Sequence, residues 1–161
     1  MENIKIINAD MKYIKSYWEA FDSIAREEEY FATTKAYPFE IIKEWIRMFV
    51  DLKMPSLWLI ENEKIIGFAE ADFRCKEIGY ISMGIIKGYR EKGYGLMLLK
   101  ELMKKGKEYG YKTLEIDVRL ENTRAIALYS KLGFERVRVI DKGLKLNDKY
   151  YDVLQMKYEY E

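Results

Sequence analysis

Two glycines, Gly93 and Gly95, stand in the segment Arg90–Gly95 just before a helical pattern. Glycine has no Cβ atom, so a ligand can come close to the backbone there. The first N–H groups of the following helix have no intrahelical partner and lie at the positive end of its dipole. A diphosphate would accept several of them, and Arg90 and Lys92 would add positive charge. Alone, the loop indicates an anion-binding turn, and glycines before a helix also serve simply as tight turns.

Two nucleotide-binding interpretations of this loop do not fit. The loop lacks the Gly-Lys-Ser/Thr sequence of a Walker A site. It also follows several strand patterns, whereas a dinucleotide-binding loop follows the first strand of a βαβ unit. The residues therefore indicate a different anionic ligand.

Composition restricts the chemistry further. The chain has no histidine and one cysteine, Cys75, which excludes a Ser-His-Asp triad and an internal disulfide and leaves no basis for a zinc site. Its 28 basic and 27 acidic residues nearly cancel, so we expect neither nucleic acid nor a membrane as partner. No apolar run suits a signal peptide or a membrane span, and we expect a cytoplasmic protein without a metal cofactor.

The elements that must position the loop can be read from hydrophobic periodicity. The pattern predicts the order βααβββαβαββ, an α+β fold in which one mixed central β-sheet is flanked by helices. Short turns between the second, third and fourth strands favour an antiparallel meander. We expect one domain over residues 1–161. The predicted strands are 4–7, 57–61, 65–73, 78–86, 114–118, 134–140 and 150–158, and the predicted helices are 10–24, 38–49, 93–109 and 122–132.

Two motifs resemble those of a known family. Arg90–Gly95 is similar to the Arg/Gln-x-x-Gly-x-Gly/Ala signature of the GNAT family of N-acetyltransferases. Further along, Asn122–Phe134 resembles the family motif Asn-x-x-Ala-x-x-x-Tyr-x-x-x-Gly-Phe. The predicted element order also matches the family over the whole chain. The resemblance implies that acetyl-CoA is a co-substrate and that its acetyl group passes directly to a primary amine in a ternary complex.

The resemblance also implies roles for particular residues. The strand before the loop would splay from its neighbour, so that its free backbone groups bind the pantetheine arm and polarise the thioester carbonyl. Tyr129 would donate a proton to the leaving thiolate, since a phenol with a pKa near ~10 is protonated at neutral pH; otherwise it merely packs its helix. The implied cofactor-binding residues are Met83, Gly84, Ile85, Arg90, Glu91, Lys92, Gly93, Tyr94, Gly95, Leu96, Asn122 and Tyr129.

The general base is less sharply indicated. Asp117 alternates with the apolar positions of its predicted strand, so it faces away from them. Some family members carry a carboxylate at this place as proton acceptor, directly or through a water. A solvated aspartate is the other interpretation. Glu70 and Asp72, on the strand predicted at 65–73, stay open as alternative bases.

The acceptor is not encoded in a motif. Glu27, Glu28 and Glu29 lie where the family usually binds its acceptor, and could attract a cationic amine or form only a solvated charge run. The closing strand is similar to that of the branch that acetylates amino acids, polyamines or ribosomal-protein termini. There it often forms dimer contacts, so a homodimer is one expectation and ordinary sheet packing the other. The candidates for those contacts are Tyr151, Val153 and Leu154. A non-catalytic acetyl-CoA sensor or interaction module is the alternative function.

Overall fold

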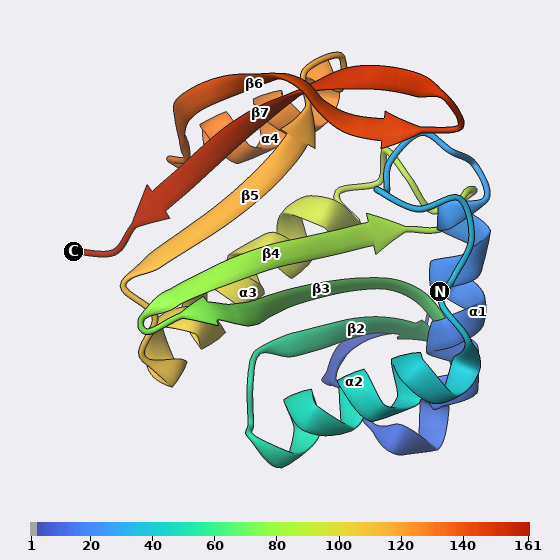
Figure 1. Cartoon of the computed structure of the whole chain (residues 1–161). Helices are drawn as coiled ribbons and strands as arrows, with labels where there is room; N and C mark the ends of the chain where they lie inside the picture. Colours follow the sequence, from blue (N-terminus) through green and yellow to red (C-terminus); the bar gives the residue numbers. More distant parts are fainter. Residues whose placement is uncertain (1–2) are drawn as a thin grey trace.

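The computed structural model describes residues 3–161, and its elements follow the predicted order (Figure 1). Residues 1 and 2, which the predicted domain includes, lie outside the described part. The α+β class with one mixed sheet is confirmed. The strands are β1 (Ile4–Asn8), β2 (Ser56–Glu61), β3 (Lys64–Cys75), β4 (Ile78–Ile85), β5 (Thr113–Arg119), β6 (Glu135–Leu146) and β7 (Lys149–Glu159). The helices are the short η1 (Met11–Tyr13), α1 (Ile14–Ala25), α2 (Phe39–Asp51), α3 (Tyr94–Tyr109) and α4 (Thr123–Lys131).

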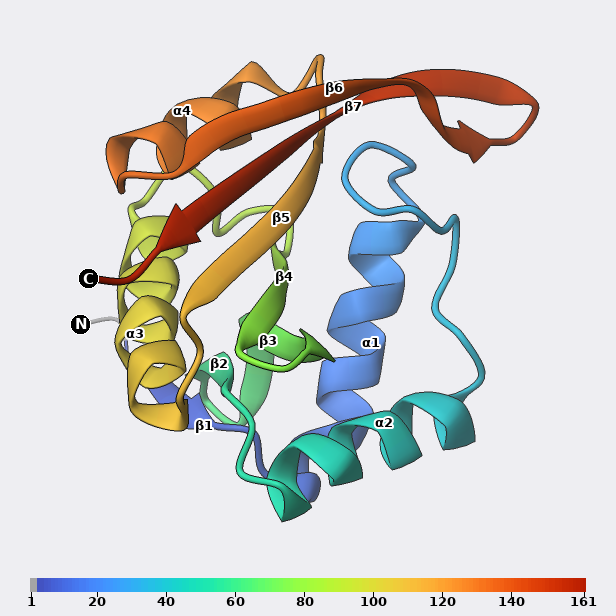
Figure 2. The same cartoon turned by 60° about the vertical axis from the view of Figure 1, so that its left-hand side comes forward.

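All seven strands form one sheet in the order β1-β2-β3-β4-β5-β7-β6. The predicted meander is present, because β1 to β4 pair antiparallel in succession. Only β4 and β5 pair in parallel, and α3 provides the crossover that a parallel pair requires. Helices α3 and α4 lie on one face of the sheet, and α1 and α2 lie on the other (Figure 2). Among the described residues, no helix is long and apolar enough to cross a membrane.

The core lies between the sheet and its helices, and it fixes α1 against the meander. Trp58 of β2 is fully buried and stacks on Tyr17 of α1, with 4.6 Å between ring centroids. Phe68 of β3 meets the same tyrosine edge-on at 5.2 Å. Aromatic pairs of this kind add about 0.5–1.5 kcal/mol beyond the burial of their area. The first half of α1 is therefore anchored to the sheet.

The sheet opens between its two parallel strands. β5 pairs with β4 only over Ile78–Tyr80, whereas β4 stays paired with β3 as far as Ile85. The two strands then diverge, as Figure 1 shows. In the described chain, residues 81–85 of β4 thus have one edge without a strand partner. This is the splay that the family resemblance implies.

Candidate functional site

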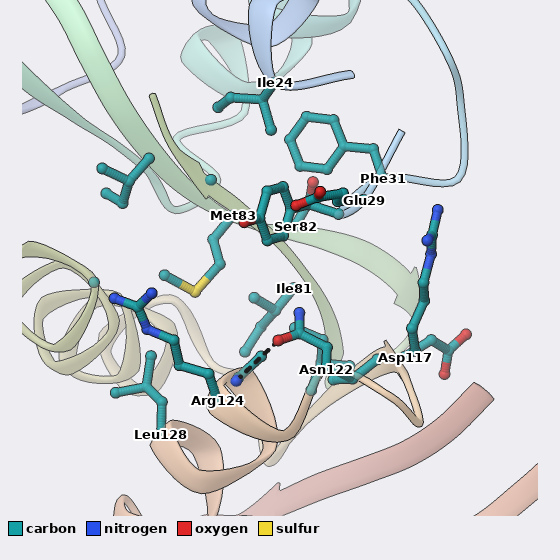
Figure 3. Close-up of a pocket in the computed structure, with 18 of the residues that line it drawn as sticks. Ile24, Glu29, Phe31, Ile81, Ser82, Met83, Asp117, Asn122, Arg124 and Leu128 are labelled. Carbon is teal, nitrogen blue, oxygen red and sulfur yellow. Dashed lines mark hydrogen bonds between the residues drawn. The ribbon is translucent and has the colours of Figure 1, made fainter. Parts of the chain in front are cut away.

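The divergence of β4 and β5 opens a cavity of about 1080 Å³. In Figure 3, Phe31 lies on one side of Met83, and Asn122 and Arg124 lie on the other. The cavity is lined by both sequence motifs and by the segment that follows α1. Every residue predicted for the site lines it except Lys92. The fold therefore brings the two motifs together, although α3 and β5 separate them in the sequence.

The free edge of β4 presents backbone groups to this cavity. The Ile86 N–H donates to the Ile66 carbonyl on the β3 side, at 3.0 Å. Because these groups alternate along a strand, Met83 and Ile85 direct theirs toward the gap, whereas Gly84 directs its own toward β3. Gly84 was predicted to bind the cofactor through its backbone, but its backbone groups face β3 and not the gap. A Cβ atom there would lie 2.9 Å from Ile24 and 3.0 Å from Phe31, so glycine permits their close approach.

The loop before α3 has the conformation that its glycines predict. Gly93 is the N-cap of α3 with φ 87°, and it has no side chain with which to cap the helix. Glu91 also has a positive φ, 63°. A Cβ atom on Gly93 would have no neighbour within 4 Å, so the left-handed backbone, and not crowding, requires glycine. Tyr94, Gly95 and Leu96 line the cavity, so the N-terminus of α3 lies where a helix start can bind an anion.

Asn122 and Arg124 form the opposite wall. The Asn122 Oδ1 accepts a hydrogen bond from the Ala125 N–H at 3.2 Å and caps α4 (Figure 3). Its amide nitrogen is then the part of the side chain that can donate into the cavity. The sequence interpretation missed Arg124, whose guanidinium lies 3.4 Å from the Glu91 carboxylate, with both side chains largely exposed. Its place in the first turn of α4, two residues after Asn122, could have indicated it.

Arg90 lines the cavity, but its guanidinium is held by other residues of the chain. Its two terminal nitrogens bind the Glu27 carboxylate at 2.9 and 2.5 Å. Its Nε donates to the Ile85 carbonyl at 2.8 Å, and the guanidinium lies 4.5 Å from the centroid of the Tyr30 ring. The hydrogen bonds from Arg90 lower the pKa of Glu27, so both partners are charged at neutral pH. The positive charge predicted for the diphosphate is thus already paired.

Tyr129 of α4 lines the cavity and is almost completely buried. Its ring packs edge-on against Phe134, with 5.5 Å between centroids. Burial raises the pKa of the Tyr129 hydroxyl above its usual value, and the nearby Tyr80 adds to the effect. The phenol therefore stays protonated well beyond neutral pH.

Asp117 on β5 lines the same cavity (Figure 3). Its Oδ2 accepts a hydrogen bond from the Tyr80 hydroxyl at 3.3 Å. Burial, and then the charge of Asp117, raise the pKa of Tyr80 to about 12, so this phenol stays a donor. Sequence reasoning missed Tyr80, because nothing in the sequence distinguishes it from the other tyrosines among the chain's 14. Its register opposite β5 is what brings it to the carboxylate.

The two alternative bases lie elsewhere. Glu70 is fully buried, where it accepts hydrogen bonds from the Tyr17 hydroxyl and from the Ser56 hydroxyl, the latter at 3.2 Å. Neither Glu70 nor Asp72 lines the cavity. Of the three carboxylates that the sequence left open, only Asp117 reaches it. In the described part of the chain, no three His, Cys, Asp or Glu side chains are placed to hold a metal ion.

Glu70 should make stability depend on pH. Burial raises its pKa from 4.5 to about 8. A carboxyl whose pKa is raised on folding contributes stability that is present below its unfolded pKa and lost as the pH rises through the folded one. Between pH 5 and pH 9, wild type should thus lose a few kcal/mol more unfolding free energy than Glu70→Gln, at about 1.4 kcal/mol per pKa unit. Urea unfolding measures this, with the exposed Glu44→Gln as control. Parallel pH profiles of wild type and Glu70→Gln would contradict it.

The acidic run is not simply a solvated charge run. Glu27 pairs with Arg90. The Glu28 carbonyl accepts from Arg119 at 2.8 Å, and its carboxylate accepts from the Asn147 amide, also at 2.8 Å. Only Glu29 lines the cavity. The first two glutamates hold the segment in place, and the third is left to face a ligand.

The residues considered for dimer contacts pack within the chain. Val153 and Leu154 are 8% and 1% exposed. Tyr151 lies under the Arg119 guanidinium, 4.2 Å from the ring centroid to the cation. Val153 and Leu154 are therefore packed inside the chain and offer no free dimer surface, whereas Tyr151 stays partly exposed.

Comparison with known proteins places the chain in a family. Residues 16–134 match the model of the acetyltransferase (GNAT) family, and the chain belongs to it. This confirms the resemblance carried by the two motifs.

Relatives with curated names match only in part. The [ribosomal protein bS18]-alanine N-acetyltransferase of Haemophilus influenzae is 39% identical over 84 residues, which cover 52% of this chain and 57% of the relative. An N-alpha-acetyltransferase of Sulfurisphaera tokodaii is 41% identical over 61 residues, or 37% of this chain and 36% of the relative. The chain thus spans little more than half of the first relative's length and about a third of the second's.

Solved structures match over the whole chain. The protein yncA of Salmonella typhimurium, solved with its cofactor acetyl-CoA, superposes with a TM-score of 0.90 at 18% identity, covering 98% of this chain and 94% of the other. A ribosomal-protein-alanine N-acetyltransferase from Brucella melitensis gives 0.90 at 19% identity, covering 97% and 99%. At these identities the likeness concerns the fold.

Proposed function

We propose that the protein transfers the acetyl group of acetyl-CoA to a primary amine. The observation that carries this proposal is one cavity that holds the edge of β4 that faces β5, the start of α3 and the buried Tyr129 hydroxyl. These groups suit a thioester on a long arm with a diphosphate. The named relatives support the same chemistry, since their activities are N-acetyl transfers.

The chain offers a place for each part of the cofactor. The N–H groups at the start of α3 would hold the diphosphate, and Arg124 stands beside them in place of Arg90. The gap-facing backbone of β4 would hydrogen-bond the pantetheine arm. Met83 supplies both an N–H and a carbonyl to that edge, whereas the Ile85 carbonyl is already bound by Arg90.

Asp117 and Tyr129 would divide the proton transfers. Asp117 takes one proton from the ammonium group, either directly or through a water, and leaves a lone pair on nitrogen. As the C–N bond forms, the Met83 N–H stabilises charge on the carbonyl oxygen, and Tyr129 stabilises charge on sulfur as the C–S bond breaks. The amine thus loses two protons, one to solvent through Asp117 and one that ends on the coenzyme A thiol.

The acceptor half of the cavity suits an amine with an apolar body. Glu29 and Asp117 place carboxylates in its wall, and Phe31 and Tyr37 add aromatic surface. Candidate acceptors are amino acids, polyamines, lysine side chains and protein N-termini. The relatives' names, which specify alanine of ribosomal protein bS18 and N-alpha-acetylation, place N-terminal peptides first in a screen.

The test is release of free thiol from acetyl-CoA with a panel of these amines. We expect turnover that depends on both substrates, together with a mass increase of one acetyl group on the amine. Thermal stabilisation by coenzyme A with no turnover on any amine would instead favour a sensor or interaction module. Stabilisation by ATP and none by coenzyme A would refute the cofactor assignment.

A cytoplasmic location and a homodimer remain part of this proposal. Both rest on the sequence interpretation. Sedimentation at several protein concentrations, with and without coenzyme A, tests the dimer, and a monomer under all conditions would remove it.

A further inference from the structure

Arg90 joins two parts of the cavity that come from distant parts of the chain. It belongs to the loop before α3, where the diphosphate is proposed to bind. Its partner Glu27 lies 63 positions earlier, two residues after the end of α1. The ion pair is largely sheltered from solvent, with the two side chains 21% and 24% exposed. A bidentate pair of this kind fixes both distance and orientation.

Little of Arg90 is left for a ligand. A guanidinium has five N–H groups in a rigid fork. The Nε group is bound by the Ile85 carbonyl, both terminal nitrogens contact Glu27, and Tyr30 lies 4.5 Å from the charged group. Binding a diphosphate would require Arg90 to leave Glu27 or to share its charge with it. The hydrogen bond to Ile85 also gives a partner to a backbone carbonyl at the end of β4.

Glu27 opens the segment that walls the acceptor half of the cavity. Glu29, Tyr30 and Phe31 follow two to four positions later and line the cavity. The other side of this segment is held by Arg119 and Asn147, which bind the carbonyl and the carboxylate of Glu28. Of the three residues that hold this segment, Arg90, Arg119 and Asn147, Arg90 is the one that belongs to the cofactor loop.

We propose that Arg90 and Glu27 form a latch, a positioning pair that sets the acceptor wall against the cofactor-binding strand. In this role Arg90 is not a ligand of the diphosphate. The inference rests on the proposed acetyl transfer for its kinetic consequences. Breaking the latch loosens the wall formed by residues 29–31 and misplaces the amine, while the start of α3 and the gap edge of Met83 still bind coenzyme A.

Three variants test the latch: Arg90→Gln, Glu27→Gln and the double variant. Each single variant is expected to lower kcat/KM for the amine roughly 10- to 100-fold, mainly through KM, with the dissociation constant of coenzyme A within about threefold of wild type. The double variant should be no worse than the poorer single one, since both remove the same contact. Lys104→Gln, an exposed charge on α3, and Glu19→Gln, exposed on α1, are the matched controls and should behave as wild type.

Three results would overturn the latch. A rise of tenfold or more in the coenzyme A dissociation constant for Arg90→Gln, but not for Glu27→Gln, would make Arg90 a diphosphate ligand. Additive losses in the double variant would make the two residues independent. The exchanged variant Arg90→Glu/Glu27→Arg should recover kcat/KM at least tenfold over Arg90→Glu alone, and the absence of recovery would count against an ion pair.

A readout without turnover separates this inference from the proposed function. Amide hydrogen exchange over residues 27–37 should rise to a similar extent in Arg90→Gln and Glu27→Gln and stay unchanged in the two controls. If wild type acetylated no amine, the proposed function would fail while the exchange result still decided the latch. Unchanged exchange in either latch variant would overturn it.

Discussion

Replacing Tyr129 with phenylalanine is expected to lower kcat by roughly 10- to 1000-fold and to leave the dissociation constant of coenzyme A within about twofold. The ring is buried beside Phe134, so phenylalanine keeps the packing and removes only the hydroxyl. The lost interaction is one that matters as the C–S bond breaks, which is why kcat falls while cofactor binding does not. Steady-state kinetics and calorimetry with the same protein measure the two effects.

The environment of Tyr129 also decides how it acts. Burial raises its pKa above the usual value of a phenol, whereas a thiol ordinarily has a pKa of about 8.5. Complete proton transfer from Tyr129 to a thiolate is therefore unfavourable at equilibrium. The hydroxyl acts mainly as a hydrogen-bond donor to the departing sulfur, and the proton released from the amine nitrogen completes the thiol. Accordingly, the profile of kcat against pH should have the same shape in wild type and in Tyr129→Phe between pH 7 and pH 10, because Tyr129 stays protonated over that range.

The matched control is Tyr109→Phe, which removes a hydroxyl from the end of α3, outside the cavity. It should turn over as wild type. A Tyr129→Phe enzyme within twofold of wild-type kcat would refute the assigned role, and the packing interpretation of Tyr129 would then stand.

The sequence could predict those parts of the site whose geometry depends on residues close together in the chain. Gly93 needs a left-handed backbone to begin α3, and Asn122 caps α4 through a contact three residues away. Both requirements act within a few positions of the chain. The element order was predictable for the same reason, since hydrophobic periodicity and turn residues are local properties.

The rest of the site depends on contacts across the sheet. Arg90 meets Glu27 and Tyr80 meets Asp117, over separations of 63 and 37 positions. No local pattern reports such a partner, so the motif position of Arg90 predicted a phosphate contact and gave no sign of the ion pair with Glu27. The same applies to Glu70, whose strand pattern allowed a catalytic base but whose partners on α1 and β2 place it in the core.

Replacing Asp117 with asparagine is expected to lower kcat/KM for the amine by roughly 100- to 1000-fold at pH 7. Asparagine has nearly the same shape and can still accept the Tyr80 hydrogen bond, but it cannot take a proton. Only the small fraction of amine that is already neutral can then react. Activity of the variant should therefore rise about tenfold per pH unit below the pKa of the amine, whereas wild type should rise less steeply.

The control for charge is Glu115→Gln, on the same face of β5 two residues earlier, where the carboxylate binds Arg74 at 3.1 Å and lies outside the cavity. It should keep wild-type activity and pH dependence. Tyr80→Phe should show a smaller loss than Asp117→Asn, because its hydroxyl only orients the carboxylate. A ratio of wild-type to Asp117→Asn activity that stays constant with pH would mean that the residue does not remove the amine proton. The base would then be Glu29, the other acidic residue considered that lines the cavity, or a water held by cavity groups, since Glu70 and Asp72 lie outside the cavity.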